Sequence, residues 1–124
     1  MTTDRTVDEG VVLIHNPRCS KSRAAVALLE ERGVAFEVRR YLDEPLTRKE
    51  LGELAKRLGR PVPEWTRQKE QAFADAGLSK DAPEKAWLDG IAAHPILLER
   101  PIVVRGDRAV VGRPTDSLLE LLDD

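Results

Sequence analysis

Short apolar runs separated by charged segments divide the first third of the chain into two strands and a helix. Residues 11–14 form an apolar run rich in β-branched side chains and closed by Asn16–Pro17, which predicts a buried strand. From Ser20 to Arg32 apolar residues recur at helical spacing, and Gly33 follows as a C-terminal cap. Every second residue from Val34 to Val38 is bulky and apolar, which predicts a second strand. A strand, helix and strand of these lengths favour a parallel, right-handed crossover.

The middle of the chain carries the clearest helical pattern and then a less regular stretch. The segment Thr47-Arg-Lys-Glu50 has the spacing of a capping box, and apolar residues then follow at i, i+3, i+4 and i+7 up to Leu58. Prolines interrupt residues 60–94, where the pattern predicts one helix over 64–76 and another over 83–93. We therefore predict a helical insertion at this point.

The last third of the chain predicts a hairpin followed by a helix. The β-branched runs 102–104 and 109–111 flank a Gly-Asp pair typical of a tight turn, and leucines at helical spacing fill 118–122. The order βαβ, helical insertion and ββα is that of the thioredoxin-like fold. We predict an α/β protein with one domain over residues 11–124, preceded by a flexible extension over residues 1–10.

Composition restricts the classes of function. The chain has 124 residues and a net charge of −2, so no overall positive field favours nucleic acid or an anionic membrane. No apolar stretch approaches the roughly 20 residues that cross a bilayer, and the acidic start does not resemble a signal peptide. The single cysteine and two histidines, His15 and His94, have no metal-ligand spacing, and no bound cofactor is expected. These features favour a cytoplasmic protein.

Cys19 is the candidate nucleophile because it follows the first strand and starts the first helix. Free N–H groups and the positive end of the helix dipole favour a thiolate there, but the dipole contributes only about 0.3–1 kcal/mol. The remainder must come from hydrogen bonds and cations, and the local candidates are His15, Arg18, Lys21 and Arg23. The alternative is a structural role, with Cys19 as a small buried apolar residue and His15 as the polar end of a strand.

The segment from His15 to Arg23 carries a family resemblance. Its sequence, HNPRCSKSR, resembles the H-N-P-x-C-x-x-S-R motif of the ArsC family of glutaredoxin-coupled arsenate reductases. The resemblance continues through Thr66–Glu70, His94–Val104 and Val111–Pro114, and so spans nearly the whole chain after Gly10. Within that family the motif variant is closest to a YfgD-like branch.

The resemblance implies a role for each motif position. A cysteine in the motif attacks arsenate, and three later arginines hold the oxyanion; the matching residues are Cys19, Arg67, Arg100 and Arg113. A histidine helps to activate the cysteine, neighbouring residues shape the anion loop, and a proline lies opposite the cysteine in the fold. The matching residues are His15, Asn16, Ser22, Arg23 and Pro101.

Three functions follow from these observations. The leading hypothesis is reduction of arsenate to arsenite by Cys19, with glutathione or another low-molecular-weight thiol as co-substrate and a glutaredoxin-type reductant, because a single cysteine cannot resolve its own disulfide. A second is a glutaredoxin-like reductase of mixed disulfides. A third is a non-catalytic, Spx-like regulator that binds RNA polymerase; such regulators often carry a C-x-x-C pair, whereas Ser22 occupies the second position here.

Overall fold

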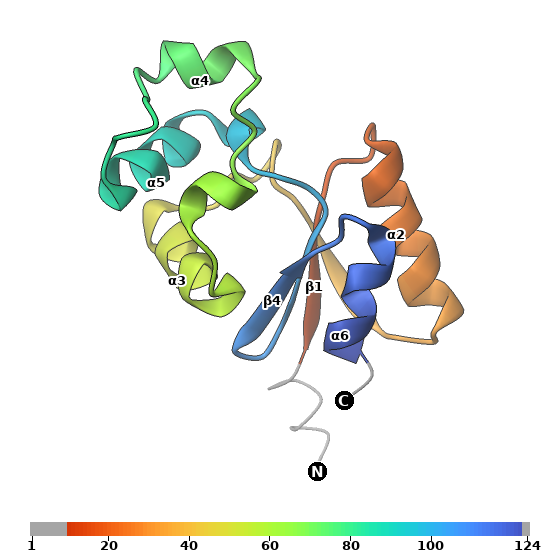
Figure 1. Cartoon of the computed structure of the whole chain (residues 1–124). Helices are drawn as coiled ribbons and strands as arrows, with labels where there is room; N and C mark the ends of the chain where they lie inside the picture. The colour runs from red at the N-terminus through yellow and green to blue at the C-terminus, as the bar shows by residue number, and fades with distance from the viewer. Residues whose placement is uncertain (1–9, 123–124) are drawn as a thin grey trace. The chain divides into compact units, whose positions relative to one another are not determined.

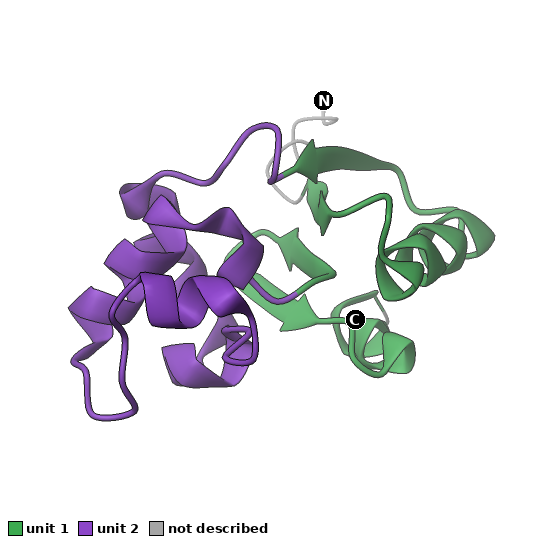
Figure 2. Cartoon of the chain, turned by 90° about the horizontal axis from the view of Figure 1, so that it is seen from above, with its two compact units in different colours: residues 1–40, 100–124 green, residues 41–99 purple. Residues whose placement is uncertain are grey.

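The chain divides into two compact units by its internal contacts. The computed structural model describes residues 10–122, so the predicted extension over residues 1–10 lies outside the described part except for Gly10. One unit combines residues 1–40 with 100–124, and the other comprises residues 41–99, as Figures 1 and 2 show.

The first unit is built on a four-stranded mixed sheet of order β2-β1-β3-β4. β1 (Val11–His15) pairs in parallel with β2 (Phe36–Arg40) and antiparallel with β3 (Ile102–Arg105), which forms a hairpin with β4 (Arg108–Val111). The predicted parallel crossover and hairpin are both present. The predicted thioredoxin-like α/β fold is thereby confirmed.

Two helical segments cover one face of this sheet. α2 (Ser20–Glu31) connects β1 to β2, while a 3₁₀ turn, η3 (Thr115–Leu118), and α6 (Leu119–Leu122) end the described chain. Figure 1 shows α2 and α6 on the same side of the strands. The sheet and these segments share one apolar core, made of Val11, Leu13, Ala25, Leu29, Val103, Leu118 and Leu121. The start of α2 is therefore fixed against the carboxyl end of β1.

The second unit is helical. It contains α3 (Arg48–Leu58), η1 (Val62–Trp65), α4 (Gln71–Asp75), α5 (Glu84–Ala93) and η2 (Pro95–Leu97). The predicted capping box of Thr47 and Glu50 is present, and α5 matches the predicted second helix of the insertion. Both tryptophans are buried in this unit. No helix among the described residues is long and apolar enough to cross a membrane.

The predicted helix over 64–76 is wrong. Only a 3₁₀ turn and the short α4 form there, because the backbone is extended at Thr66 and then forms a turn before α4. Thr66 forms an antiparallel bridge with Leu98, so its backbone is used for pairing and not for a helix. This pairing positions the neighbouring Arg67.

The second strand begins two residues later than predicted. Gly33 adopts a positive φ of 68°, and the Val34 N–H donates to the Leu29 carbonyl at 3.0 Å. Val34 is therefore part of the end of α2 and not of the strand. Pairing with β1 starts at Phe36, and β2 lies at the edge of the sheet. Val38 is 47% exposed, so the predicted alternation does not place it in the core.

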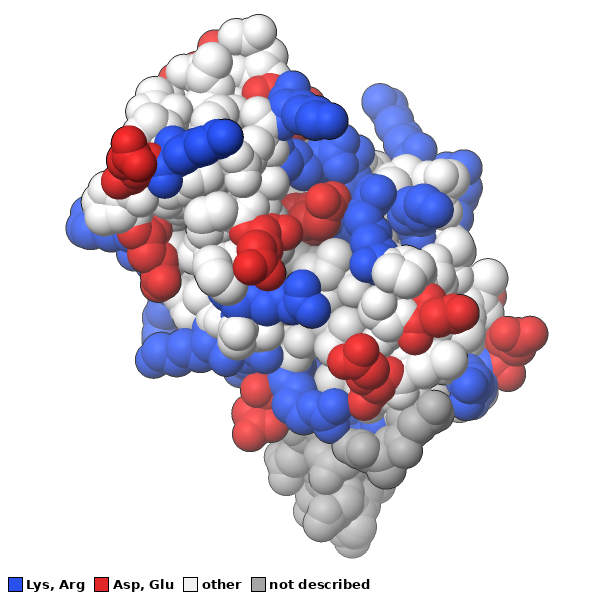
Figure 3. Space-filling model, viewed as in Figure 1, with Lys and Arg blue, Asp and Glu red and all other residues white. Residues whose placement is uncertain are grey.

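Acidic and basic side chains are interspersed on the face of the molecule seen in Figure 3. This distribution agrees with the near-neutral net charge of −2.

Gly112 follows β4 where the hairpin approaches the segment before β3. Its N–H donates to the Pro101 carbonyl at 2.9 Å. A Cβ atom at Gly112 would lie 3.0 Å from Cγ of Pro101 and 3.3 Å from the two methyl groups of buried Leu118. A side chain at this position would therefore have to displace a rigid ring and a core leucine.

We predict that Gly112→Ala lowers the free energy of unfolding by about 1–3 kcal/mol, the usual cost of overpacking. The matched control is Gly52→Ala in α3, where the added methyl group would meet only Nη1 of Arg48, at 3.5 Å. That variant is expected to gain about 0.5–1 kcal/mol from helix propensity. Urea unfolding followed by circular dichroism measures both. Equal stability of Gly112→Ala and the unchanged chain would show that this contact is not tight.

Candidate active site

Cys19 lies at the boundary between the loop after β1 and helix α2. It is the N-cap residue, with extended backbone angles (φ −94°, ψ 125°), and its N–H donates to the Asn16 carbonyl at 2.9 Å. Cys19 is partly exposed. The first turn of α2 contains no acidic residue, so no carboxylate there opposes a negative charge on the sulfur. Cys19 therefore presents a partly exposed thiol at a helix start.

Three motif residues hold the loop that carries Cys19. The Asn16 N–H donates to the buried Ser22 hydroxyl at 3.3 Å, and the Asn16 side-chain oxygen accepts the Arg18 N–H at 3.0 Å. Nη1 of Arg23 donates to the Pro17 carbonyl at 2.9 Å. Asn16, Ser22 and Arg23 therefore fix the backbone between β1 and α2.

Arg100 and Arg113 come from the far end of the sequence and meet at Cys19. Nη2 of Arg113 lies 3.6 Å from the Cys19 sulfur, and its Nε donates to the Arg100 carbonyl at 2.7 Å. Both arginines precede a proline in a cis peptide bond, Pro101 and Pro114. The side chain of Arg100 also interacts with the Cys19 thiol. The structure thus brings together Cys19 and two of the three arginines implied by the resemblance.

The pKa of the Cys19 thiol lies below its ordinary value. Burial raises this pKa, but the N–H groups of Ser22 and Lys21 and the side chain of Arg100 together lower it by more. The two N–H groups belong to the first turn of α2. The Cys19 side chain forms no capping hydrogen bond at this helix start. The contributing cation is therefore Arg100, and not the local candidates Arg18, Lys21 or Arg23.

His15 ends β1 and is buried. Burial, followed by the positive charges of Arg40 and Arg23, lowers the pKa of its imidazole. Arg40 lies directly opposite His15 in the parallel pair of β1 and β2. Its Nδ1 atom has no hydrogen-bond partner within the described part of the chain. His15 is therefore a neutral imidazole at neutral pH and supplies no positive charge to the site.

Arg67 belongs to the second unit, where two carboxylates hold it. Its Nε and Nη2 lie 3.1 and 3.0 Å from the same oxygen of Glu70, and its Nη1 lies 3.2 Å from Oε1 of Glu99. Burial lowers the pKa of the guanidinium, but hydrogen bonds and charges from both partners raise it overall. Neither glutamate was among the site residues predicted from the sequence. The i,i+3 spacing of Arg67 and Glu70 is a usable signal, whereas Glu99 is 32 residues away.

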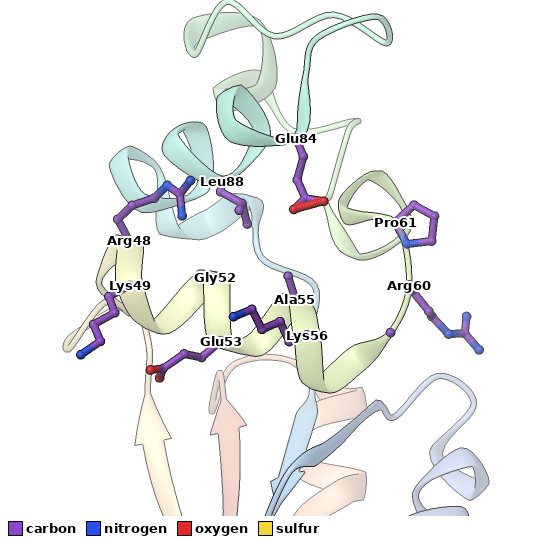
Figure 4. A pocket seen from close by; sticks show the side chains of 11 residues that line it. Arg48, Lys49, Gly52, Glu53, Ala55, Lys56, Arg60, Pro61, Glu84 and Leu88 are labelled. Atoms are coloured by element: carbon purple, nitrogen blue, oxygen red, sulfur yellow. The ribbon is translucent and has the colours of Figure 1, made fainter.

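Two of the cavities formed by the described residues lie within the second unit. One of about 480 Å³ is lined by residues 66–70 and Glu99, and so contains Arg67. The other, of about 690 Å³, lies along α3 and α5, and Figure 4 shows side chains of both charges around it. None of the predicted site residues lines this larger cavity. No cluster of three or more potential metal ligands occurs among residues 10–122.

We predict that Arg100→Gln raises the pKa of Cys19, because a cation and a hydrogen bond to the thiolate are lost from a partly exposed site. Alkylation by iodoacetamide measured against pH reports this value, since only the thiolate reacts. In the unchanged chain the midpoint is expected below that of an ordinary cysteine thiol.

Arg18→Gln is the matched control, because Arg18 adjoins Cys19 in sequence but does not contribute to the lowered pKa. Its midpoint should equal that of the unchanged chain. Equal shifts in both variants would mean that general electrostatics, and not Arg100, lower the pKa.

Comparison with known proteins identifies the family of the chain. The profile of the ArsC family matches residues 14–121. An arsenate reductase of Neisseria meningitidis serogroup A is 45% identical over 90% of this chain and 97% of its own length, and YfgD of Escherichia coli, described as uncharacterized, is 41% identical over 90% and 96%. A solved arsenate reductase structure from Vibrio cholerae is 40% identical, with a TM-score of 0.85 over 90% of this chain and 97% of that one. The chain belongs to the ArsC family.

Proposed function

We propose that this protein reduces arsenate to arsenite, with Cys19 as the nucleophile and an external thiol as the reductant. The observation that carries the proposal is the contact of a partly exposed, low-pKa thiol with Arg100 and Arg113. A thiolate beside two guanidinium groups suits attack on an anion, since forked donors bind tetrahedral oxyanions and bring them to the sulfur. Arsenate reductases among the relatives support the same substrate.

The first step of the proposed reaction forms a bond between sulfur and arsenic. The Cys19 thiolate attacks arsenic(V), and one arsenate oxygen leaves as water after taking up protons. Arg100 and Arg113 offset the negative charge of the oxyanion near the thiolate, which would otherwise repel it. We assign Arg67 to the same oxyanion on the basis of the family resemblance.

The second step transfers two electrons to arsenic. A low-molecular-weight thiol such as glutathione attacks the Cys19 sulfur, the sulfur–arsenic bond breaks with its electron pair on arsenic, and arsenite leaves. A mixed disulfide remains on Cys19. Because the chain has one cysteine, a second thiol of the glutaredoxin type must reduce it. The reducing cytoplasm supplies both thiols.

We propose that His15 acts as a neutral proton acceptor near the loop and not as a cation. Its lowered pKa and its unpartnered Nδ1 among the described residues support this role. Asn16, Ser22 and Arg23 act by holding the loop backbone. The Pro101 carbonyl accepts the Gly112 N–H, which ties the segment before β3 to the end of β4.

The test is arsenate-dependent oxidation of NADPH in the presence of glutathione, glutaredoxin and glutathione reductase. We expect activity in the unchanged chain, none in Cys19→Ser, and a mass increase of one glutathione on Cys19 when glutaredoxin is omitted. Arg67→Gln should raise KM for arsenate by about tenfold or more, the value of one charge-assisted contact. Arg60→Gln, which removes an exposed arginine paired with Glu64, should not change KM.

Two other outcomes would point to the alternative functions. A folded chain that does not reduce arsenate but reduces a glutathionylated peptide through Cys19 would be a mixed-disulfide reductase. A chain that turns over neither substrate and binds RNA polymerase would be a regulator. Either result would overturn the proposal.

A further inference from the structure

The cavity that contains Arg67 also contains a lysine whose charge the fold does not use. The cavity, of about 480 Å³, is lined by Thr66, Arg67, Gln68, Lys69, Glu70 and Glu99. The side chains of Thr66 and Gln68 each donate to a backbone carbonyl, at 2.8 and 3.0 Å, and both glutamates accept from Arg67. Within residues 10–122, Lys69 is the one member of this lining whose side chain makes no hydrogen bond or ion pair. Its ammonium group is therefore available to a ligand.

A turn fixes the backbone from which the Lys69 side chain starts. The Glu70 N–H donates to the Arg67 carbonyl at 3.3 Å, so residues 67–70 form a turn with Gln68 and Lys69 at its corner. The Gln68 amide holds this corner by donating to the Pro63 carbonyl. The stem of Lys69 thus begins at a fixed point two residues from Arg67, and its four-carbon chain leaves the ammonium group free to adjust its position.

Arg67 alone gives an anion direction but shares its positive charge with the protein. All three nitrogens of its guanidinium contact a carboxylate of Glu70 or Glu99. Each Nη atom carries a second hydrogen, which can still orient a bound oxygen. A charged oxyanion in this cavity gains more from a cation that has no carboxylate partner, because no existing ion pair has to be shared with it. Lys69 is the lysine or arginine of this lining that meets the requirement within the described part of the chain.

We propose that Lys69 is a further anion-binding residue of this protein, whose ammonium group contacts the oxyanion that Arg67 orients. The inference rests on the proposed function, in which Arg67 binds the substrate anion. The two cations have different tasks: the anchored guanidinium is directional, whereas the lysine is a point charge on a flexible stem and follows the anion. Because Lys69 is exposed, salt screens its attraction for the anion.

The test measures arsenate binding by isothermal titration calorimetry to the Cys19→Ser chain, which cannot turn over. Adding Lys69→Gln should weaken binding by about three- to tenfold, which is less than the full value of a charge-assisted contact because solvent reaches the side chain. Lys69→Arg, which keeps the charge, should bind within about twofold of the chain that retains Lys69. Raising the ionic strength from roughly 0.05 M to 0.5 M should reduce the effect of Lys69→Gln to less than about twofold.

The matched control is Lys80→Gln, which removes the same charge from another exposed lysine of the second unit. Lys80 lines neither of the two cavities described for this unit, so its loss should leave arsenate affinity unchanged. Urea unfolding should give the same midpoint for both variants, which separates binding from stability. Full arsenate affinity in Lys69→Gln, equal weakening by Lys80→Gln, or no arsenate binding by the Cys19→Ser chain would overturn the inference.

The two proposals fail separately. If the unchanged chain reduces arsenate while Lys69→Gln leaves arsenate affinity intact, the role of Lys69 is wrong and the reductase activity remains. If arsenate binds with the expected dependence on Lys69 but is never reduced with any thiol, the proposed activity is wrong and the anion site remains.

Discussion

The lowered pKa of the Cys19 thiol depends on groups from both ends of the chain. The first turn of α2 provides N–H groups, and Arg100 provides a cation from a segment about eighty residues later. The sheet makes this meeting possible. In the antiparallel pair of β1 and β3, Ile14 lies opposite Ile102, so continuing the same register places Arg100 opposite the loop that follows β1. The hairpin then returns Arg113 to the same loop.

Magnitudes explain why neither source alone is enough. Lowering a thiol pKa by about two units requires roughly 2.7 kcal/mol of preference for the thiolate. A helix start contributes about 0.3–1 kcal/mol, and one hydrogen bond to a charged group contributes about 1.5–3 kcal/mol before solvent weakens it at a partly exposed site. A thiolate at neutral pH therefore needs both the helix and the arginine, which explains why the site lies where α2 begins and the β3 segment enters.

The sequence was sufficient to predict elements whose signals are local. The capping box at Thr47, the hairpin around Gly106 and the parallel crossover formed as predicted, because each depends on residues a few positions apart. One prediction failed where distant pairing determined the outcome, and another where the end of a helix extended into the expected strand. The helix expected over 64–76 was lost to a bridge with Leu98, and β2 began late because Val34 ends α2.

In the candidate site, too, features with local sequence signals were predicted and features that depend on distant contacts were not. Cys19 and the arginines were identified from the motifs. Cations adjacent to Cys19 in sequence were expected to stabilise the thiolate, whereas the cation that lowers the pKa of Cys19 is Arg100. Spacing within one helix cannot reveal a contact formed by strand register. For the same reason Glu99, 32 residues from Arg67, had no local signal as its partner.

Three of the arginines near the candidate site residues are anchored to the protein by hydrogen bonds or ion pairs. Arg23 donates to the Pro17 carbonyl, Nε of Arg113 donates to the Arg100 carbonyl, and Arg67 is held by two glutamates. A lysine has a single nitrogen on a flexible stem and cannot both anchor itself and present an aimed pair of donors. Guanidinium groups held in this way lose little side-chain entropy when an anion binds. In a chain with a net charge of −2, an anion site therefore depends on fixed orientation and not on excess positive charge.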